Sequence, residues 1–305
     1  MNLRSYIVAL HAALFGILIA CSPAGSGSML LMGAGKARSG CADANVVAWR
    51  NAVIAASGTV SPAQEGYVCT LVGSLKSHSL FSVQDRIWLH ASENTQQATI
   101  DLVSAAVATP VSAPTFAASQ GYTFSGANYI DTGYAPFTNG TNFLRDSSSI
   151  STYVRTSRTS TNNGTAIGMF DAGGNGNQGI ILPLGGSSLL SYDVNNSQFT
   201  AQVTNSPANA QGFYTATRTG ASVQAVYKNS NSTALATNTT ASIALPNVSP
   251  PTFYIGARNQ NGTANLFSTD QIAVTVLGGG LTGANAAQLQ TDINAYMTSL
   301  GTNVY

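Results

Sequence analysis

From Thr115 onward, apolar and polar residues alternate with a period of two in several short segments, such as 150–155, 223–228 and 272–277. Side chains of a β-strand point alternately to its two faces, so this period is typical of strands. Turn-forming sequences such as Asn261-Gly262 separate the segments. Many short strands joined in this way predict a mainly β fold, a two-sheet antiparallel jelly-roll sandwich. Further expected strands are 178–184, 198–203, 213–219 and 252–257.

A smaller part of the chain has helical spacing instead. Apolar residues recur every three or four positions between 46 and 54, and Gly58 follows where a C-terminal cap would fall. Ser61 and Pro62 are a strong helix start, and Gln64 is placed to close a capping box. We therefore expect a small helical subdomain at residues 43–83.

The β-rich domain that follows, residues 84–305, is expected to begin with a buried strand at 85–90. A short helix or turn is expected at 96–106. A helix capped by Thr282 and ended by Gly301 should close the chain. Its apolar stripe is expected to dock on the β-domain, because an exposed stripe favours aggregation.

After Glu93, the remaining 212 residues contain no glutamate and no histidine. Hydrolytic and transfer reactions usually need a tunable acid, base or nucleophile, so the β-domain is expected to bind rather than to catalyse. Only 8% of the residues are charged, against roughly 25% in an average soluble protein. The net charge is +1 with no basic run, which argues against a nucleic-acid partner.

The first 21 residues have the features of an export signal. Arg4 precedes an apolar run over 6–20, too short for a comfortable membrane span, and the run meets Cys21. Residues 18–21, Leu-Ile-Ala-Cys, resemble a bacterial lipobox, which implies lipidation of Cys21. Two alternatives stay open: a short anchor helix with a chance cysteine, or a true start at Met29 or Met32.

Residues 22–42 are rich in Gly, Ser, Ala and Pro and are expected to be a flexible linker. Cys41 and Cys69 remain once Cys21 is set aside. In an exported protein they are a candidate disulfide, and two small buried thiols are the alternative.

Several segments resemble concanavalin A-like, laminin-G-like jelly-roll domains. Residues 121–133 resemble the opening strand pair of that family, and 253–257 with 267–272 and the terminal helix resemble its closing part. Residues 85–102 resemble the lead-in of versions from phages and prophages. The resemblance covers about 84–301 and implies a sandwich that binds glycans or other surface ligands.

The glycosidases of this fold carry a Glu-x-Asp-x-x-Glu strand motif, because a retaining mechanism needs two carboxylates. This chain has no such motif, and Glu65 and Glu93 both lie before the alternating segments that begin at Thr115. An enzyme with a Ser or Thr nucleophile would need a histidine or lysine base, and no recognisable motif supplies one. We therefore expect no enzyme activity.

The segment 171–177 places oxygen-bearing side chains at Asp171, Asn175 and Asn177, as in a calcium loop. Calcium usually needs several carboxylates, and this segment has one. A plain hairpin loop is therefore favoured, with Ca²⁺ as a weak alternative and no other cofactor or metal expected.

Two further pairs of residues are candidates for binding. Arg155 and Arg158 flank a Ser/Thr-rich stretch and are placed to meet an acidic glycan or a neighbouring subunit, although solvated arginines at strand ends are commoner. His78 and His90 have no cysteine or carboxylate at metal-ligand spacing, so we expect structural roles for both.

Together these features favour a non-catalytic, surface-displayed jelly roll that binds a surface glycan or envelope component in adhesion or host recognition, as part of a multivalent display. Two other interpretations stay open. One is a structural phage virion protein of the tail, fibre or head that contacts other virion proteins. The other is an outer-membrane lipoprotein that meets the membrane only through its lipid anchor.

Overall fold

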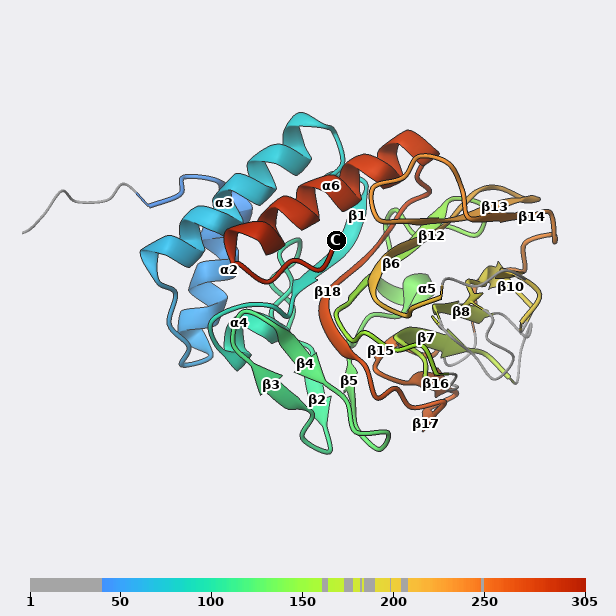
Figure 1. Ribbon diagram of the computed structural model, residues 1–305, viewed down its shortest axis with the longest axis horizontal. Coiled ribbons are helices and arrows are strands. Elements are labelled where there is room, and N and C mark those ends of the chain that lie inside the picture. The colour runs from blue at the N-terminus through green and yellow to red at the C-terminus, as the bar shows by residue number, and fades with distance from the viewer. Residues whose placement is uncertain are drawn as a thin grey trace, which may run out of the picture. The chain divides into compact units, whose positions relative to one another are not determined.

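The alternating segments form strands that pair into two facing sheets in the computed structural model (Figure 1). The structure describes residues 40–160, 164–172, 178–181, 183, 190–197, 199–203, 208–247 and 250–305. Residues Gly40–Tyr305 form one compact unit. The fold is mainly β, a sandwich with a few helices and a C-terminal helix, which confirms the predicted fold class.

The first sheet has the strand order β14-β13-β12-β6-β18-β4-β3, and β1 also pairs with β18. All of these pairings are antiparallel. The strands are β1 (Gln84–Leu89), β3 (Thr115–Ala117), β4 (Gly121–Thr123), β6 (Ser148–Val154), β12 (Gly212–Gly220), β13 (Val223–Lys228), β14 (Ala236–Asn238) and β18 (Gln271–Gly278).

The second sheet has the order β10-β8-β7-β15-β5-β2, and a hairpin of β16 and β17 joins it at β7. Its strands are β2 (Thr109–Val111), β5 (Tyr129–Asp131), β7 (Ile167–Phe170), β8 (Gln178–Ile181), β10 (Val194–Asn196), β15 (Tyr254–Ile255), β16 (Arg258–Gln260) and β17 (Thr263–Asn265). Two short strands, β9 (Leu190–Ser191) and β11 (Gln202–Val203), pair separately.

Helices α3 and α6 lie side by side over the first sheet, on the face away from the second sheet (Figure 1). The helices are α2 (Ala44–Ala55), α3 (Pro62–Ser77), α4 (Thr95–Thr99), α5 (Pro136–Asn139) and α6 (Gly283–Ser299). Because both faces of the first sheet are covered, every residue of β6 is buried despite the alternating sequence. Among the described helices, none combines the length and apolarity needed to cross a membrane.

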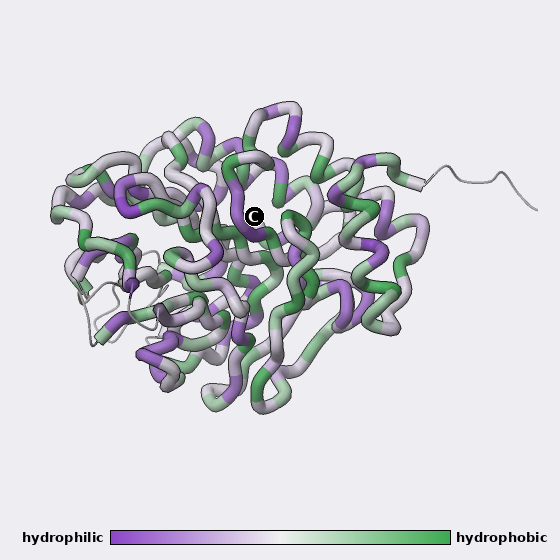
Figure 2. Tube along the Cα trace, turned by 180° about the vertical axis from the view of Figure 1, so that it is seen from behind, coloured by the Kyte–Doolittle hydropathy of each residue, from purple (hydrophilic) through white to green (hydrophobic). Residues whose placement is uncertain are grey.

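Two hydrophobic cores follow from this layering. Ile150 and Val154 of β6 belong to the core between the sheets, whereas Tyr153 between them belongs to the core under the helices. The helices expected as a separate subdomain at 43–83 share this second core with the first sheet. Figure 2 follows the strands in hydropathy colours, and hydrophobic segments run through the middle of the molecule.

At the start of α3, the structure has one of the two predicted cap contacts: the N-cap at Ser61 forms, but the capping box does not. The Ser61 side chain accepts a hydrogen bond from Gln64 N, as an N-cap should. The Gln64 side chain, however, is buried and donates to Tyr296 Oη at 2.8 Å, so the predicted capping box is wrong. Glu93 takes its place and accepts from Ser61 N at 3.0 Å. A tertiary partner 32 positions away therefore completes the cap.

The end of α2 is shifted by one residue from the prediction. Ser57, with φ of 62°, takes the left-handed position expected for Gly58. Gly58 N then donates to Val53 O at 2.8 Å, the longer bond of a Schellman motif. The terminal helix follows its prediction, since Thr282 caps it and Gly301 has a φ of 69° just after it.

Candidate functional site

The second sheet carries a shallow hollow of about 440 Å³ at one end of β15. It forms where β15, α5 and the β16–β17 turn meet, and it is lined by Thr138, Pro250, Pro251, Thr252, Tyr254, Asn259, Asn261 and Gly262. Ile130 and Ile255 of β5 and β15 point into the core between the sheets. Because strand side chains alternate, their neighbours Asp131 and Tyr254 point to the outer face, where Asp131 is partly exposed and Tyr254 is 5% exposed.

A stacked pair of tyrosines stands beside the hollow. The rings of Tyr129 and Tyr254 have centroids 4.3 Å apart and planes inclined by 22°. The antiparallel pairing of β5 with β15 sets Tyr254 opposite Asp131, two residues beyond Tyr129. Burial, together with the Asp131 carboxylate, raises the pKa of Tyr254, so its phenol stays protonated. Tyr254 therefore adds a rigid, neutral, amphipathic wall to the hollow.

Asp131 is held in place beside this wall. Its Oδ1 accepts from Thr252 Oγ1 at 2.8 Å and from Gly133 N at 2.9 Å. Within the described part of the chain, its Oδ2 has no hydrogen bond. The carboxylate is half-buried. It therefore has an oriented oxygen available to accept a hydrogen bond from a ligand.

The turn between β16 and β17 supplies two amides. Asn259 is buried and bonded on both ends, with Nδ2 donating to Thr252 O at 2.9 Å and Oδ1 accepting from Gly262 N at 2.7 Å. Asn261 is exposed, and its Oδ1 accepts from Ala172 N at 3.1 Å. Its Nδ2 makes no hydrogen bond to any described residue. Asn259 therefore fixes the wall, and Asn261 offers a donor.

An exposed ring lies close to the hollow in the chain. Phe137 of α5, directly before Thr138, is 53% exposed. Tyr67 on α3, at 36%, is the other large aromatic residue that is exposed in the described ranges. Aromatic rings at a binding site contribute apolar contact area at low entropic cost. Phe137 is therefore the exposed ring that is adjacent in sequence to a lining residue, Thr138.

A second hollow of about 370 Å³ lies on the first sheet at the start of α6. Hydroxyl groups dominate its wall, including those of Thr217, Thr237 and Thr282. No carboxylate is among its described lining residues. The described lining of the hollow beside β15 has no carboxylate either, but Thr252 of its wall is hydrogen-bonded to the Asp131 carboxylate and Asn261 offers an amide donor. It is therefore the stronger candidate for recognition.

Of the predicted calcium ligands, Asp171 is buried at the end of β7, and Asn175 and Asn177 lie outside the described residues. Among the residues that are described, no three His, Cys, Asp or Glu side chains gather as a metal site would require. Cys21, the predicted lipidation site, also lies outside the described residues.

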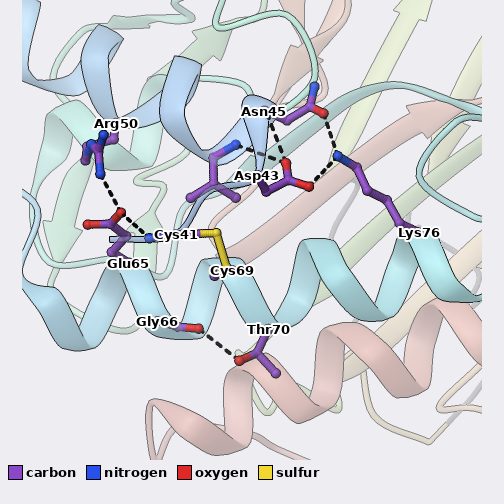
Figure 3. The surroundings of a disulfide bond; sticks show 10 residues. Cys41, Asp43, Asn45, Arg50, Glu65, Gly66, Cys69, Thr70 and Lys76 are labelled. Atoms are coloured by element: carbon purple, nitrogen blue, oxygen red, sulfur yellow. Dashed lines mark hydrogen bonds and ion pairs between the residues drawn. A yellow bond between two sulfur atoms is a disulfide. The ribbon is translucent and has the colours of Figure 1, made fainter. Parts of the chain in front are cut away.

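Cys41 and Cys69 form a disulfide with a Cα–Cα distance of 5.9 Å (Figure 3). The bond joins the segment before α2 to the middle of α3. Cys41 N also donates to Glu65 Oε1 at 3.0 Å, and Glu65 pairs with Arg50 at 2.6 Å. The two cysteines are therefore paired rather than two separate buried thiols. They lie in the helical layer and not at the hollow beside β15.

The two candidate arginines have structural roles. Arg158 forms a bidentate pair with Asp270, through bonds of 3.0 and 2.8 Å, and only 9% of its side chain is exposed. Arg155 donates to Thr302 O at 3.1 Å and to the side chain of Gln271. The expectation of a solvated arginine is wrong for Arg158, whereas Arg155 is partly exposed and also has partners distant in sequence. Neither lines the hollow beside β15.

The histidines behave as predicted. His90 is fully buried, with Nδ1 donating to Ala98 O at 2.8 Å and Nε2 3.3 Å from Thr275 Oγ1. His78 Nδ1 lies 2.9 Å from Asp292 Oδ2 and joins α3 to α6. Both side chains bond to distant parts of the fold, and neither lines either of the two hollows described above.

The site was only partly visible in the sequence. Tyr129 and Asp131 fall in the segment 121–133, and Tyr254 falls in 253–257, both of which carry the family resemblance. Their juxtaposition depends on a pairing across more than 120 residues, which no local pattern encodes. Pro250-Pro251 and Asn261-Gly262 were the available local signals, since each marks a turn.

No family model matches the chain, and no curated protein matches it. It is similar in structure to a Trypanosoma rangeli sialidase mutant with trans-sialidase activity, at 12% identity and a TM-score of 0.43 over 77% of this chain. This chain spans about two fifths of that protein, 39% of its length.

Two smaller solved domains are also similar. One is the CBM40 of a Ruminococcus gnavus IT-sialidase, at 12% identity and a TM-score of 0.40, over 56% of this chain and 96% of that one. The other is domain 4 of AbnA, a GH43 extracellular arabinanase from Geobacillus stearothermophilus, in complex with arabinotriose. It has 13% identity and a TM-score of 0.40, over 67% of this chain and 99% of that one. Similarities at this level assign neither a family nor a ligand.

Proposed function

We propose that the protein is a non-catalytic glycan-binding protein and that the hollow beside β15 is its binding site. One observation carries the proposal: a rigid tyrosine and an exposed amide line the hollow, and Thr252 of the same wall orients the Asp131 carboxylate next to it. Ligand sites commonly combine apolar and aromatic walls with a few oriented polar groups. A sugar offers matching surfaces, since its ring carbons are apolar and its hydroxyls both donate and accept.

The roles of the groups follow from their chemistry. Asp131 Oδ2 accepts from a sugar hydroxyl, and Asn261 Nδ2 donates to one. The Phe137 ring contacts the apolar face of the sugar at the rim. The Thr252 and Asn259 side chains act by holding the wall, because their own polar groups already have partners.

The absence of catalysis is part of the proposal. A retaining glycosidase needs two carboxylates about 5 Å apart, one as nucleophile and one as acid and base. The described residues that line this hollow include no carboxylate, and the one bonded to its wall is Asp131. The arrangement suits recognition, in which a single acceptor is enough.

We further propose display at an extracellular surface, either on a virion or on a bacterial envelope. The Cys41–Cys69 disulfide supports this, because disulfides persist mainly in oxidising compartments. A shallow hollow binds one sugar weakly, and display in many copies raises the overall affinity without new contacts.

The test is a glycan array probed with the full chain, followed by titration of the best ligand. Phe137→Ala should weaken binding about tenfold, which corresponds to loss of an aromatic contact. Tyr67→Ala is the matched control, since that ring is also exposed but lies on α3. The proposal fails if the multimerised protein binds no glycan, or if both variants bind like the wild type.

A further inference from the structure

The charged side chain that is hydrogen-bonded to the wall of the hollow is a carboxylate. Asp131 is hydrogen-bonded to Thr252 of its wall, and Asp171 directly precedes Ala172, whose backbone contacts Asn261. Among the described residues that line the hollow there is no lysine or arginine. A ligand that extends from the hollow past Thr252 therefore meets the Asp131 carboxylate, and no described lining residue offers a cation.

Cations elsewhere in the described ranges are already engaged. Of the 12 basic residues, nine lie in the described ranges, and each contacts a protein group. Their partners are Glu65 for Arg50, Asp43 for Lys76, Asp101 for Arg86, Ser242 for Arg145, Gln271 for Arg155, Asp270 for Arg158, Thr240 O for Arg218, Asn209 O for Lys228 and Asn265 for Arg258.

Arg258 is the basic residue nearest to the hollow in sequence, and it is held away from a ligand. It is 5% exposed, and its guanidinium stacks over Phe170 at 4.9 Å. Its Nε and one terminal nitrogen donate to Asn265 and Gln260. Releasing this group for a ligand would break these bonds and expose Phe170.

On the basis of the proposed function, we infer that the ligand is a neutral glycan, selected against acidic sugars by Asp131. A sialic acid, uronic acid or sulfated sugar would bring an anion next to this carboxylate with no cation to offset it. Two like charges about 4 Å apart repel by about 1 kcal/mol in water and by more near a protein surface. The expected discrimination is therefore about fivefold or more in favour of the neutral form.

The experiment compares one neutral oligosaccharide with its sialylated and sulfated forms, titrated into the full-length protein at low and high salt. The neutral form should bind at least about fivefold more tightly at low salt, and the ratio should shrink at high salt because screening weakens repulsion. Asp131→Asn should bring the ratio toward one. Asp146→Asn, an exposed carboxylate on another loop, is the matched control and should leave the ratio unchanged.

The outcomes separate the two proposals. Equal or tighter binding of the acidic forms by the wild type overturns the neutral preference and leaves glycan binding in place. An unchanged ratio in Asp131→Asn overturns the assignment to this carboxylate. Absence of binding to every glycan overturns both, and only this result counts against the proposed function itself.

Discussion

The Oγ1 of Thr252 donates a hydrogen bond of 2.8 Å to Oδ1 of Asp131, across 121 positions of sequence. This bond turns one carboxylate oxygen toward the wall and leaves the other for a ligand. It exists because β15 pairs with β5 and brings Thr252, two residues before Tyr254, close to Asp131. The orientation of the acceptor is thus a product of sheet pairing.

Thr252→Val should weaken binding of a neutral glycan about threefold to tenfold, since one hydrogen bond contributes about 1 kcal/mol. The substitution keeps the shape of the side chain and removes the donor that orients Asp131. Thr252→Ser keeps the hydroxyl and should bind like the wild type. Isothermal titration of both variants decides the point, and equal affinities would show that the bond does not orient the acceptor.

Gly256→Ala should lower the free energy of unfolding by about 3 kcal/mol or more. Gly256 has a φ of 80°, and a Cβ there would overlap the buried ring of Phe124. Gly262→Ala is the control, because its φ is 89° but a Cβ would meet nothing within 4 Å. Only backbone strain remains there, which costs about 1–2 kcal/mol. Urea unfolding of both variants measures the difference, and equal losses would exclude the clash with Phe124.

Stability should fall as the pH drops from about 6.5 to about 4. Burial lowers the pKa of His90 from 6.5 to about 4 in the folded state. Between these values the unfolded chain binds the proton and the folded chain does not, so acidification favours unfolding. A gap of this size corresponds to about 3 kcal/mol once the pH is below both values.

The measurement is the free energy of unfolding in urea at several pH values, in the wild type and in His90→Gln. In the variant, the free energy of unfolding should depend less steeply on pH between about 4 and about 6.5, because His90 no longer contributes. An identical pH profile in the two proteins would contradict the assignment.

The Cys41–Cys69 bond should stabilise the fold by about 3 kcal/mol, because it closes a loop over a sequence separation of 28 and so restricts the unfolded chain. The double variant Cys41→Ser, Cys69→Ser should unfold at correspondingly lower urea concentration. A reductant should destabilise the wild type and leave the double variant unchanged. A reductant effect of the same size in both proteins would point to another cause.

The sequence predicted what depends on local pattern. Alternation indicated β6, β13 and β18, and the caps at Ser61 and Thr282 were correct because each is a contact within three residues. The predictions were wrong where a contact distant in sequence sets the role of a side chain. Gln64 donates to Tyr296 instead of closing the capping box, and Arg158 pairs with Asp270 instead of facing solvent. The hollow belongs to this second kind, since α5, β15 and the β16–β17 turn meet only in the folded chain.

The helices that cover the first sheet make the two outer faces of the sandwich different. The hollow lies on the second sheet, so the layer of α3 and α6 and the hollow are separated by both sheets. Coupling to a bead through α3 should therefore leave ligand capture intact, whereas coupling at the β16–β17 turn should block it. The fold thus sets the direction in which an immobilised copy faces its ligand.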